Sequence, residues 1–195
     1  TFYPTTAAST ISGYSHLVTS TDDADYDDPA VDVSTGTITS ADTLIASLAS
    51  DEGVLDGTIS AISLTTVGSV RRASGNSMGR FWFEIYKRTS GGTETLIATS
   101  GKTSYTDIEE YTQFFEAAYI ATTVFSSTDR LVTKYYGNTD GSDAVFEFRF
   151  GGTEPIRSLL PVPVSVIPSV TNAGAITADT SAFAGILSGT DTTVQ

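Results

Sequence analysis

The sequence predicts an all-β fold, an antiparallel β-sandwich and, within that class, a jelly roll, with extended N- and C-terminal arms. Phe146, Phe148 and Phe150 alternate with polar residues, which is the period of a strand that buries one face. The segment 81–100, FWFEIYKRTSGGTETLIATS, holds two strand patterns around a glycine-rich turn. Turn-forming stretches rich in Gly, Asn, Asp and Ser separate further strand candidates.

The elements divide the chain into three parts. Residues 1–35, rich in Thr, Ser, Ala and Asp with scattered apolar anchors, are predicted to be an acidic arm. Residues 36–158 are the predicted sandwich domain, in which residues 40–48 fit either a short capped helix or a strand. Six further strands are expected at 57–67, 78–87, 93–99, 111–121, 130–136 and 144–150.

Residues 159–195 form the third part, a Pro-rich strap and linker. Pro161, Pro163 and Pro168 each remove a main-chain donor, so this stretch is not expected to be a central strand. Its apolar side chains need a surface that buries them, and we expect the strap to contact a second subunit. The predicted interface residues are Leu159, Leu160, Phe183, Ile186 and Leu187.

Charge and composition exclude several classes of partner. The net charge is −13, and residues 1–70 carry acids but no Lys or Arg, so a polyanionic nucleic acid would be repelled. No apolar run approaches the roughly 18–20 residues of a membrane-spanning helix, so no membrane insertion is expected. The chain has no cysteine and therefore no disulfide or thiolate metal site.

One acidic run is a candidate for binding a cation. Its carboxylates could supply oxygen ligands to Ca²⁺, although the run lacks the glycine and the distal Glu of an EF-hand loop. A solvated acidic loop is the alternative, and no other metal or cofactor is expected. The candidate ligands are Asp22, Asp23, Asp25, Asp27 and Asp28.

Residues 75–79, GNSMG, match the G-x-S-x-G nucleophile elbow of hydrolases. That motif needs a strand before it, a helix after it and a histidine downstream. Here a strand pattern follows, and the only histidine, His16, lies upstream of Ser77. We therefore expect a hairpin loop at this position and no catalytic residues.

Aromatic side chains with polar tips are frequent in the predicted sandwich. They could form a subunit interface or stack on sugar rings, and the interface or ordinary half-buried positions are favoured. The residues are Trp82, Tyr86, Tyr105, Tyr111, Tyr119, Tyr135 and Tyr136.

Four segments resemble a known family. FWFEIYKRTSGGTETLIATS (81–100), TDRLVTKYYG (128–137) and VFEFRFGGT (145–153) resemble a β-sandwich module of tailed-phage fibres and other virion proteins. AFAGILSGTDTTVQ (182–195) resembles a phage-fibre connector that leads into trimerising heptads. The resemblance covers about half of the chain.

This resemblance implies a non-enzymatic structural protein of the virion, an extracellular particle. The chain would be a fibre or a head/tail appendage module that forms a homotrimer, binds other virion proteins and takes part in host attachment, with a host-surface glycan as a further partner. Two alternatives stay open: a capsid decoration or cement protein, and a bacterial surface adhesin or carbohydrate-binding module.

Overall fold

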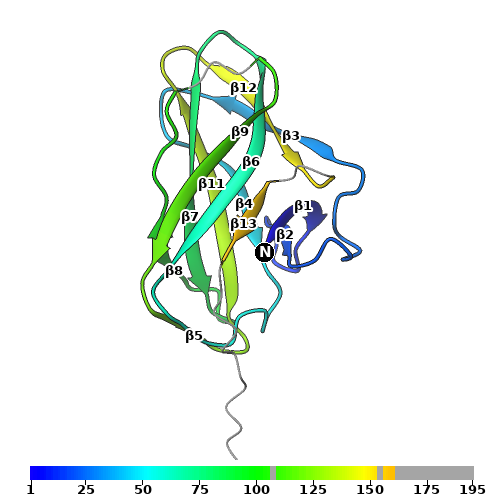
Figure 1. The fold of residues 1–195 in the computed structure, drawn as a ribbon, viewed down its shortest axis with the longest axis vertical. Helices are drawn as coiled ribbons and strands as arrows, with labels where there is room; N and C mark the ends of the chain where they lie inside the picture. The colour runs from blue at the N-terminus through cyan, green and yellow to red at the C-terminus, as the bar shows by residue number, and fades with distance from the viewer. Residues whose placement is uncertain (106–108, 153–155, 161–195) are drawn as a thin grey trace, which may run out of the picture. The chain divides into compact units, whose positions relative to one another are not determined.

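The computed structural model describes residues 1–105, 109–152 and 156–160, and within them the chain is all-β. Two sheets lie face to face as an antiparallel β-sandwich (Figure 1). The predicted fold class is therefore confirmed, whereas the jelly-roll topology stays a prediction. In this described part, no helix is long and apolar enough to cross a membrane.

The first sheet has six strands in the order β1-β2-β4-β11-β7-β8. Residues 40–48, which fitted a helix or a strand, contribute a strand to it. Neighbouring strands are antiparallel except β2 and β4, which are parallel. The strands are β1 (Tyr3–Ala8), β2 (Ser15–Val18), β4 (Thr43–Ala49), β11 (Arg130–Thr139), β7 (Gly79–Arg88) and β8 (Glu94–Thr99).

The second sheet is organised around the long strand β6 (Ile62–Ser74). One edge of β6 pairs with β9 (Thr112–Ile120), and the other edge pairs first with β13 (Arg157–Leu159) and then with β12 (Ala144–Phe150). The strand β3 (Val31–Ile38) completes the sheet beside β12. Two short strands, β5 (Gly57–Ile59) and β10 (Thr123–Phe125), pair separately.

The core lies between the two sheets and confirms the predicted inward face of β12. Phe146, Phe148 and Phe150 are all buried. The ring of Phe81, on β7, meets Phe146 and Phe148 edge to face at centroid distances of 5.1 and 5.2 Å. Such contacts stabilise the core beyond the area that they bury.

The predicted hairpin within 81–100 is present as β7 and β8. Its turn closes with hydrogen bonds from Thr89 N to Thr93 O and from Gly92 N to Thr89 O, both of 2.9 Å. Gly92 has a φ of 86°, a conformation that glycine adopts without the strain of a Cβ atom.

The N-terminal residues differ from the predicted arm. The hairpin of β1 and β2 joins the first sheet through β4, and Phe2 and Leu17 are buried in the core. These strands are short and rich in threonine, so their sequence shows little apolar alternation. Thr5, for example, is fully buried and donates its hydroxyl to the carbonyl of His16. The sandwich therefore begins near residue 2 and not at residue 36.

A glycine pair after β12 fixes the loop between β2 and β3. Gly152 N donates to Asp27 O at 2.9 Å, and the Tyr26 hydroxyl donates to Gly152 O at 2.8 Å. A Cβ atom on Gly151 would lie 1.6 Å from the Asp27 carbonyl oxygen. Only glycine allows this approach, so the pair holds the acidic loop against the sandwich.

The C-terminal boundary of the sandwich also differs slightly from the prediction. Leu159 belongs to β13 and Leu160 is buried, so both residues are part of the sandwich instead of the strap. Ser158 forms a bridge with Phe2 through two backbone hydrogen bonds of 2.8 Å. The predicted interface residues Phe183, Ile186 and Leu187 lie outside the described residues.

Candidate functional site

The strand β9 turns a row of apolar side chains outward. Phe114, Ala118 and Ile120 face the core, whereas Phe115 and Tyr119 are on the opposite side of the strand. Phe115 is 67% exposed and Tyr119 is 64% exposed, the two most exposed large apolar side chains in the described part of the chain. Exposed aromatics on one strand face are unusual enough to suggest a binding surface.

The register of the sheet extends this row across three strands. Phe115 is opposite Val67 on β6, and Ala117 is opposite Thr65, which is in turn opposite Leu159 on β13. Because partners on antiparallel strands point to the same side, these residues form one surface. We call it the apolar face; it comprises Phe115, Ala117, Tyr119, Thr65, Val67 and Leu159.

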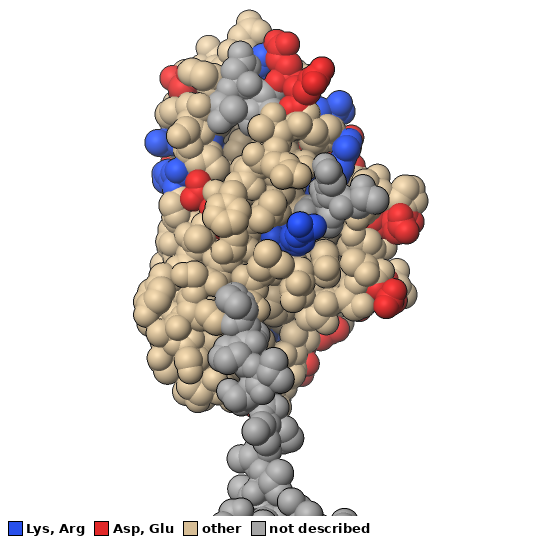
Figure 2. Space-filling model, viewed as in Figure 1, with Lys and Arg blue, Asp and Glu red and all other residues tan. Residues whose placement is uncertain are grey.

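None of the six residues of the apolar face is acidic or basic, but Arg157 is opposite Val67 and points to the same side of the sheet. Figure 2 shows charged atoms mainly around the upper end and the edges of this side of the molecule, with neutral residues over most of the area between them. The basic Arg157, opposite Val67, lies at its rim. In a chain of net charge −13, this surface therefore combines six uncharged residues with one basic neighbour, Arg157.

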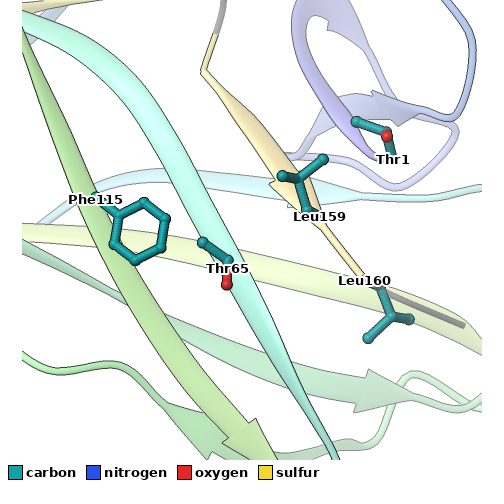
Figure 3. A pocket seen from close by; sticks show the side chains of 5 residues that line it. All are labelled: Thr1, Thr65, Phe115, Leu159 and Leu160. Carbon is teal, nitrogen blue, oxygen red and sulfur yellow. The ribbon is translucent and has the colours of Figure 1, made fainter.

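A hollow of about 440 Å³ lies within the apolar face (Figure 3). Phe115 lines one side of it from β9, Thr65 lines it from β6, and Leu159 and Leu160 line it from the end of β13. Thr1 completes the lining because the Phe2–Ser158 bridge brings the first residues beside β13. Its lining is therefore aliphatic and aromatic, with threonine as the polar component.

The same sheet becomes charged only a few residues further along β6. Arg71 pairs with Glu147 at 2.7 Å, and Arg149 pairs with Asp32 at 3.1 Å. The ring of Tyr111 lies near both guanidinium groups, 4.8 Å from Arg71 and 3.7 Å from Arg149. These charges are neutralised locally, so this end of the sheet does not share the character of the apolar face.

The outer face of the other sheet also carries aromatic rings, but they are covered. Trp82 on β7 stacks on Tyr136 of β11 with centroids 5.7 Å apart, and it is only 5% exposed. The Lys102 ammonium lies 3.7 Å from the centroid of the Trp82 ring and also pairs with Asp42 at 3.0 Å. Trp82 is therefore not free to stack on a sugar ring.

Glu94 is the centre of a second cluster on that covered face. Its carboxylate accepts hydrogen bonds from Lys134 at 2.7 Å, from Tyr14 at 2.5 Å and from Arg88 at 3.1 Å. Burial opposes ionisation of Glu94, but these donors outweigh it and hold the pKa of the carboxyl below its ordinary value. The Lys134 ammonium also lies 4.5 Å from the ring centroid of Tyr86.

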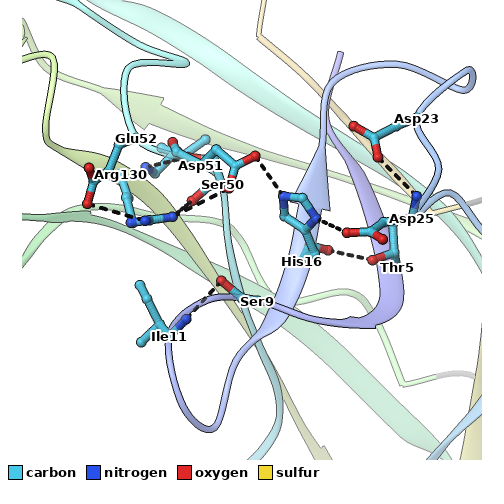
Figure 4. Close-up of polar contacts among 11 residues, drawn as sticks. Thr5, Ser9, Ile11, His16, Asp23, Asp25, Ser50, Asp51, Glu52 and Arg130 are labelled. Atoms are coloured by element: carbon cyan, nitrogen blue, oxygen red, sulfur yellow. Dashed lines mark hydrogen bonds and ion pairs between the residues drawn. The ribbon is translucent and has the colours of Figure 1, made fainter.

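The only histidine of the chain joins the β1–β2 hairpin to the loop after β4 (Figure 4). His16 Nδ1 contacts an Asp25 carboxylate oxygen at 2.6 Å, and Nε2 contacts Asp51 at 3.3 Å. Arg130 extends the cluster to Asp51 at 3.7 Å and Glu52 at 3.2 Å. Both ring nitrogens face carboxylates, so neither is directed at a hydroxyl nucleophile.

Ser77 of the elbow-like motif is in the loop between β6 and β7, as predicted. Met78, next to it, accepts a hydrogen bond from Asp140 at the distal end of β11, whereas His16 lies near Ala49 and Arg130 at the other end. Ten residues of β11 separate these ends, about 30 Å in an extended strand. Ser77 and His16 therefore cannot act together as nucleophile and base.

The five candidate calcium ligands do not converge on one point. Asp27 accepts hydrogen bonds from the Thr6 amide at 2.7 Å and hydroxyl at 2.6 Å, and Asp25 faces His16. Asp23 accepts the Asp25 amide at 3.0 Å. In the part of the chain that the structure describes, no group of three or more Asp, Glu, His or Cys side chains is placed to hold a metal ion.

Of the residues named from the sequence, Leu159 and Tyr119 belong to the apolar face and Leu160 lines its hollow. Leu159 and Leu160 were predicted interface residues, and Tyr119 was among the candidate aromatics. Phe115 was not singled out. Its neighbour Phe114 is also aromatic, and adjacent residues of a strand point to opposite faces, so the sequence does not show which of the two is exposed. The usable signal is the spacing of Phe115, Ala117 and Tyr119, which places three neutral residues on one strand face.

No family model and no curated protein matches the sequence. Among solved structures, two of a CocE/NonD family hydrolase from Staphylococcus aureus resemble the chain. One has a TM-score of 0.49 at 12% identity and matches 64% of this chain and 33% of the hydrolase. The other has a TM-score of 0.48 at 10% identity and matches 70% and 37%. The chain thus spans about a third of the hydrolase's length.

A third solved structure contains the CBM22-1 and GH10 modules of endo-1,4-beta-D-xylanase 10B from Clostridium thermocellum, complexed with xylohexaose. Its TM-score is 0.25 at 18% identity, over 54% of this chain and 19% of the xylanase. At TM-scores below 0.5, these similarities carry no argument about function.

Proposed function

We propose that this chain is a non-enzymatic structural module of a virion, a fibre or head/tail appendage protein that assembles as a homotrimer through the apolar face. The observation that carries the proposal is the exposed, neutral surface around Phe115, Tyr119 and Leu159. Exposed apolar area of this kind is typical of protein interfaces, where aromatic anchors supply most of the binding energy.

The electrostatics of the chain support association through this surface in particular. Copies with a net charge of −13 repel one another, and the repulsion is smallest where neutral surfaces meet. The resemblance of segments 81–100, 128–137 and 145–153 to phage-fibre modules supports the virion context, and these segments form β7–β8, β11 and β12 of the sandwich.

The mass of residues 1–195 in solution tests the proposal. Light scattering at increasing concentration is expected to approach three times the 20.5 kDa of one chain. A chain that remains monomeric at high concentration and occupies a monomeric position in the particle would contradict it.

A carbohydrate-binding function is the second candidate, because Phe115 and Tyr119 present free ring faces on which a sugar could stack. Binding of the isolated chain to a glycan array, abolished by Phe115→Ser and Tyr119→Ser, would favour this candidate over assembly. A trimer that binds no glycan would favour the structural module.

A further inference from the structure

We propose that the apolar face is the docking site for residues 161–170 of a neighbouring copy of this chain. The inference rests on the proposed assembly function and names the partner of its interface. The segment, PVPVSVIPSV, begins directly after Leu160, which lines the hollow of the apolar face.

The two surfaces match in charge and polarity. No charged residue occurs between Arg157 and Asp179, and the six residues of the apolar face are uncharged, with the basic Arg157 beside them. Five valine or isoleucine side chains in ten residues need burial, and Phe115, Tyr119 and Leu159 offer exposed area for them. Contact between them brings no acid of one copy close to an acid of another.

The spacing of the aromatic rings suits a proline-rich peptide. Proline-rich segments bind aromatic-lined surfaces in the polyproline II conformation, which they adopt before binding. Phe115 and Tyr119 are four residues apart on a strand, about 14 Å. Pro163 and Pro168 are five residues apart, about 15 Å in polyproline II. Each proline can therefore lie against one ring.

Both edges of β13 are already hydrogen-bonded, so the peptide is expected to contact the apolar face and not a strand edge. One side of β13 is paired with β6, and Ser158 is bonded to Phe2 on the other side. A peptide cannot be added there as a further strand. Pro161, Pro163 and Pro168 also lack the amide donors that strand addition requires.

The prolines favour docking on a neighbouring copy. Pro161 and Pro163 fix their own φ near −65°, and each restricts the residue before it to extended backbone. These restrictions disfavour the sharp reversal that would return the peptide to the face beside its own β13. Each copy then donates one segment and accepts another, a head-to-tail contact that can close into a ring of three.

A photocrosslinker tests the occupant directly. The full chain is produced with benzoylphenylalanine in place of Phe115, irradiated, and analysed by gel and peptide mass spectrometry. We expect a product of dimer size in which β9 is joined to a peptide within residues 161–170. The matched control places the crosslinker at Leu96, which is 50% exposed on β8 in the other sheet and should give no such product.

Two variants measure the strength of the contact. Phe115→Ser should weaken association about tenfold or more, the loss of one aromatic anchor, with the melting temperature unchanged within about 2 °C. The double change Val162→Asp and Val164→Asp lies beyond the last strand of the sandwich and should weaken association to a similar extent.

The outcomes separate this inference from the proposed function. A trimer whose crosslinks join Phe115 positions to the sandwich of another copy would overturn the docking of 161–170 while the assembly function stands. A product of monomer size, joined to the chain's own segment, would likewise overturn docking between copies. A monomer without any crosslink would overturn both proposals.

Discussion

The outer faces of the two sheets both carry aromatic side chains, but one face covers them and the other exposes them to solvent. On the face formed by β7 and β11, Trp82 is covered by Tyr136 and Lys102, and only 5% of it is exposed. On the face formed by β6, β9 and β13, Phe115 is 67% exposed. On the first face the aromatic rings are covered by neighbours of the same chain, so their burial stabilises the monomer. The second leaves apolar area exposed to solvent.

The comparison teaches that aromatic content alone does not identify an interface. Cations placed over a ring contribute to stability while they remove the ring from solvent. A ring next to neutral neighbours stays accessible. What distinguishes the two faces is therefore the charge of the residues beside the aromatics, and each face can be altered separately.

The largest effect is expected at the core between the two faces. Phe148 contacts Phe81 and Tyr135 and is 1% exposed, so Phe148→Ala should lower the free energy of unfolding by about 3–5 kcal/mol. Denaturant titration measures this loss. A value below about 1 kcal/mol would show that β12 buries its other face.

The next effect concerns the covered face. Trp82→Ala removes the ring that Tyr136 and Lys102 enclose, and we expect a loss of about 3 kcal/mol in the free energy of unfolding. Association measured by light scattering should not change. If the variant were as stable as the parent chain but failed to associate, the assignment of the two faces would have to be exchanged.

Glu94 makes the stability of the covered face dependent on pH. Its folded pKa is depressed below the ordinary 4.5, so its contribution is present above pH 4.5 and is lost as the pH falls through the folded value. Glu94→Gln should cost about 1–2 kcal/mol at pH 7, because Lys134 loses its charged partner.

Denaturant titrations of both proteins between pH 7 and pH 2 check this expectation. The difference between Glu94→Gln and the parent should narrow as the carboxylate of the parent is protonated. A constant difference across the range would mean that the charge of Glu94 is not what stabilises the cluster.

The smallest effect is expected at a residue beneath the apolar face, where a substitution should raise the free energy of unfolding and not lower it. Glu116 follows Phe115 on β9 and points away from the apolar face, and burial raises the pKa of its carboxyl above the ordinary 4.5. The fold therefore loses stability as the pH rises above 4.5 and the carboxyl ionises. Glu116→Gln should gain about 0.5 kcal/mol at pH 7 and nothing at pH 3, measured by the same titrations. A loss at pH 7 would contradict it.

Glu116 also shows why the sequence could not orient β9. A charged residue normally marks the solvent side of a strand, which would have placed Phe115, Ala117 and Tyr119 in the core. The tertiary structure instead turns Phe114 and Ile120 inward, with Glu116 half-buried beside Gly101. By contrast, β12 offered three phenylalanines against Val145, Glu147 and Arg149, and its inward face was predicted correctly.

The N-terminal strands were missed for a related physical reason. β1 and β2 bury few apolar residues and satisfy buried polar groups through specific hydrogen bonds, such as that from Thr5 to His16 O. The amino-acid composition of a segment shows its apolar content, but it does not show which distant residues form hydrogen bonds with it. The hairpin of β7 and β8 was predictable because its turn and both strands are local in sequence.

The bridge between Phe2 and Ser158 gives the sandwich a defined mechanical weak point. These residues lie on antiparallel strands, and the chain leaves both of them on the same side, through Thr1 and through Leu159. Tension between residues 1 and 160 would therefore open the two 2.8 Å hydrogen bonds one after the other, as a zipper opens, and would not load them together in shear. The ten-residue ladder between β7 and β11 lies beyond this seam. Stretching would peel the first hairpin and β13 away at low force while the centre of the sandwich remains folded.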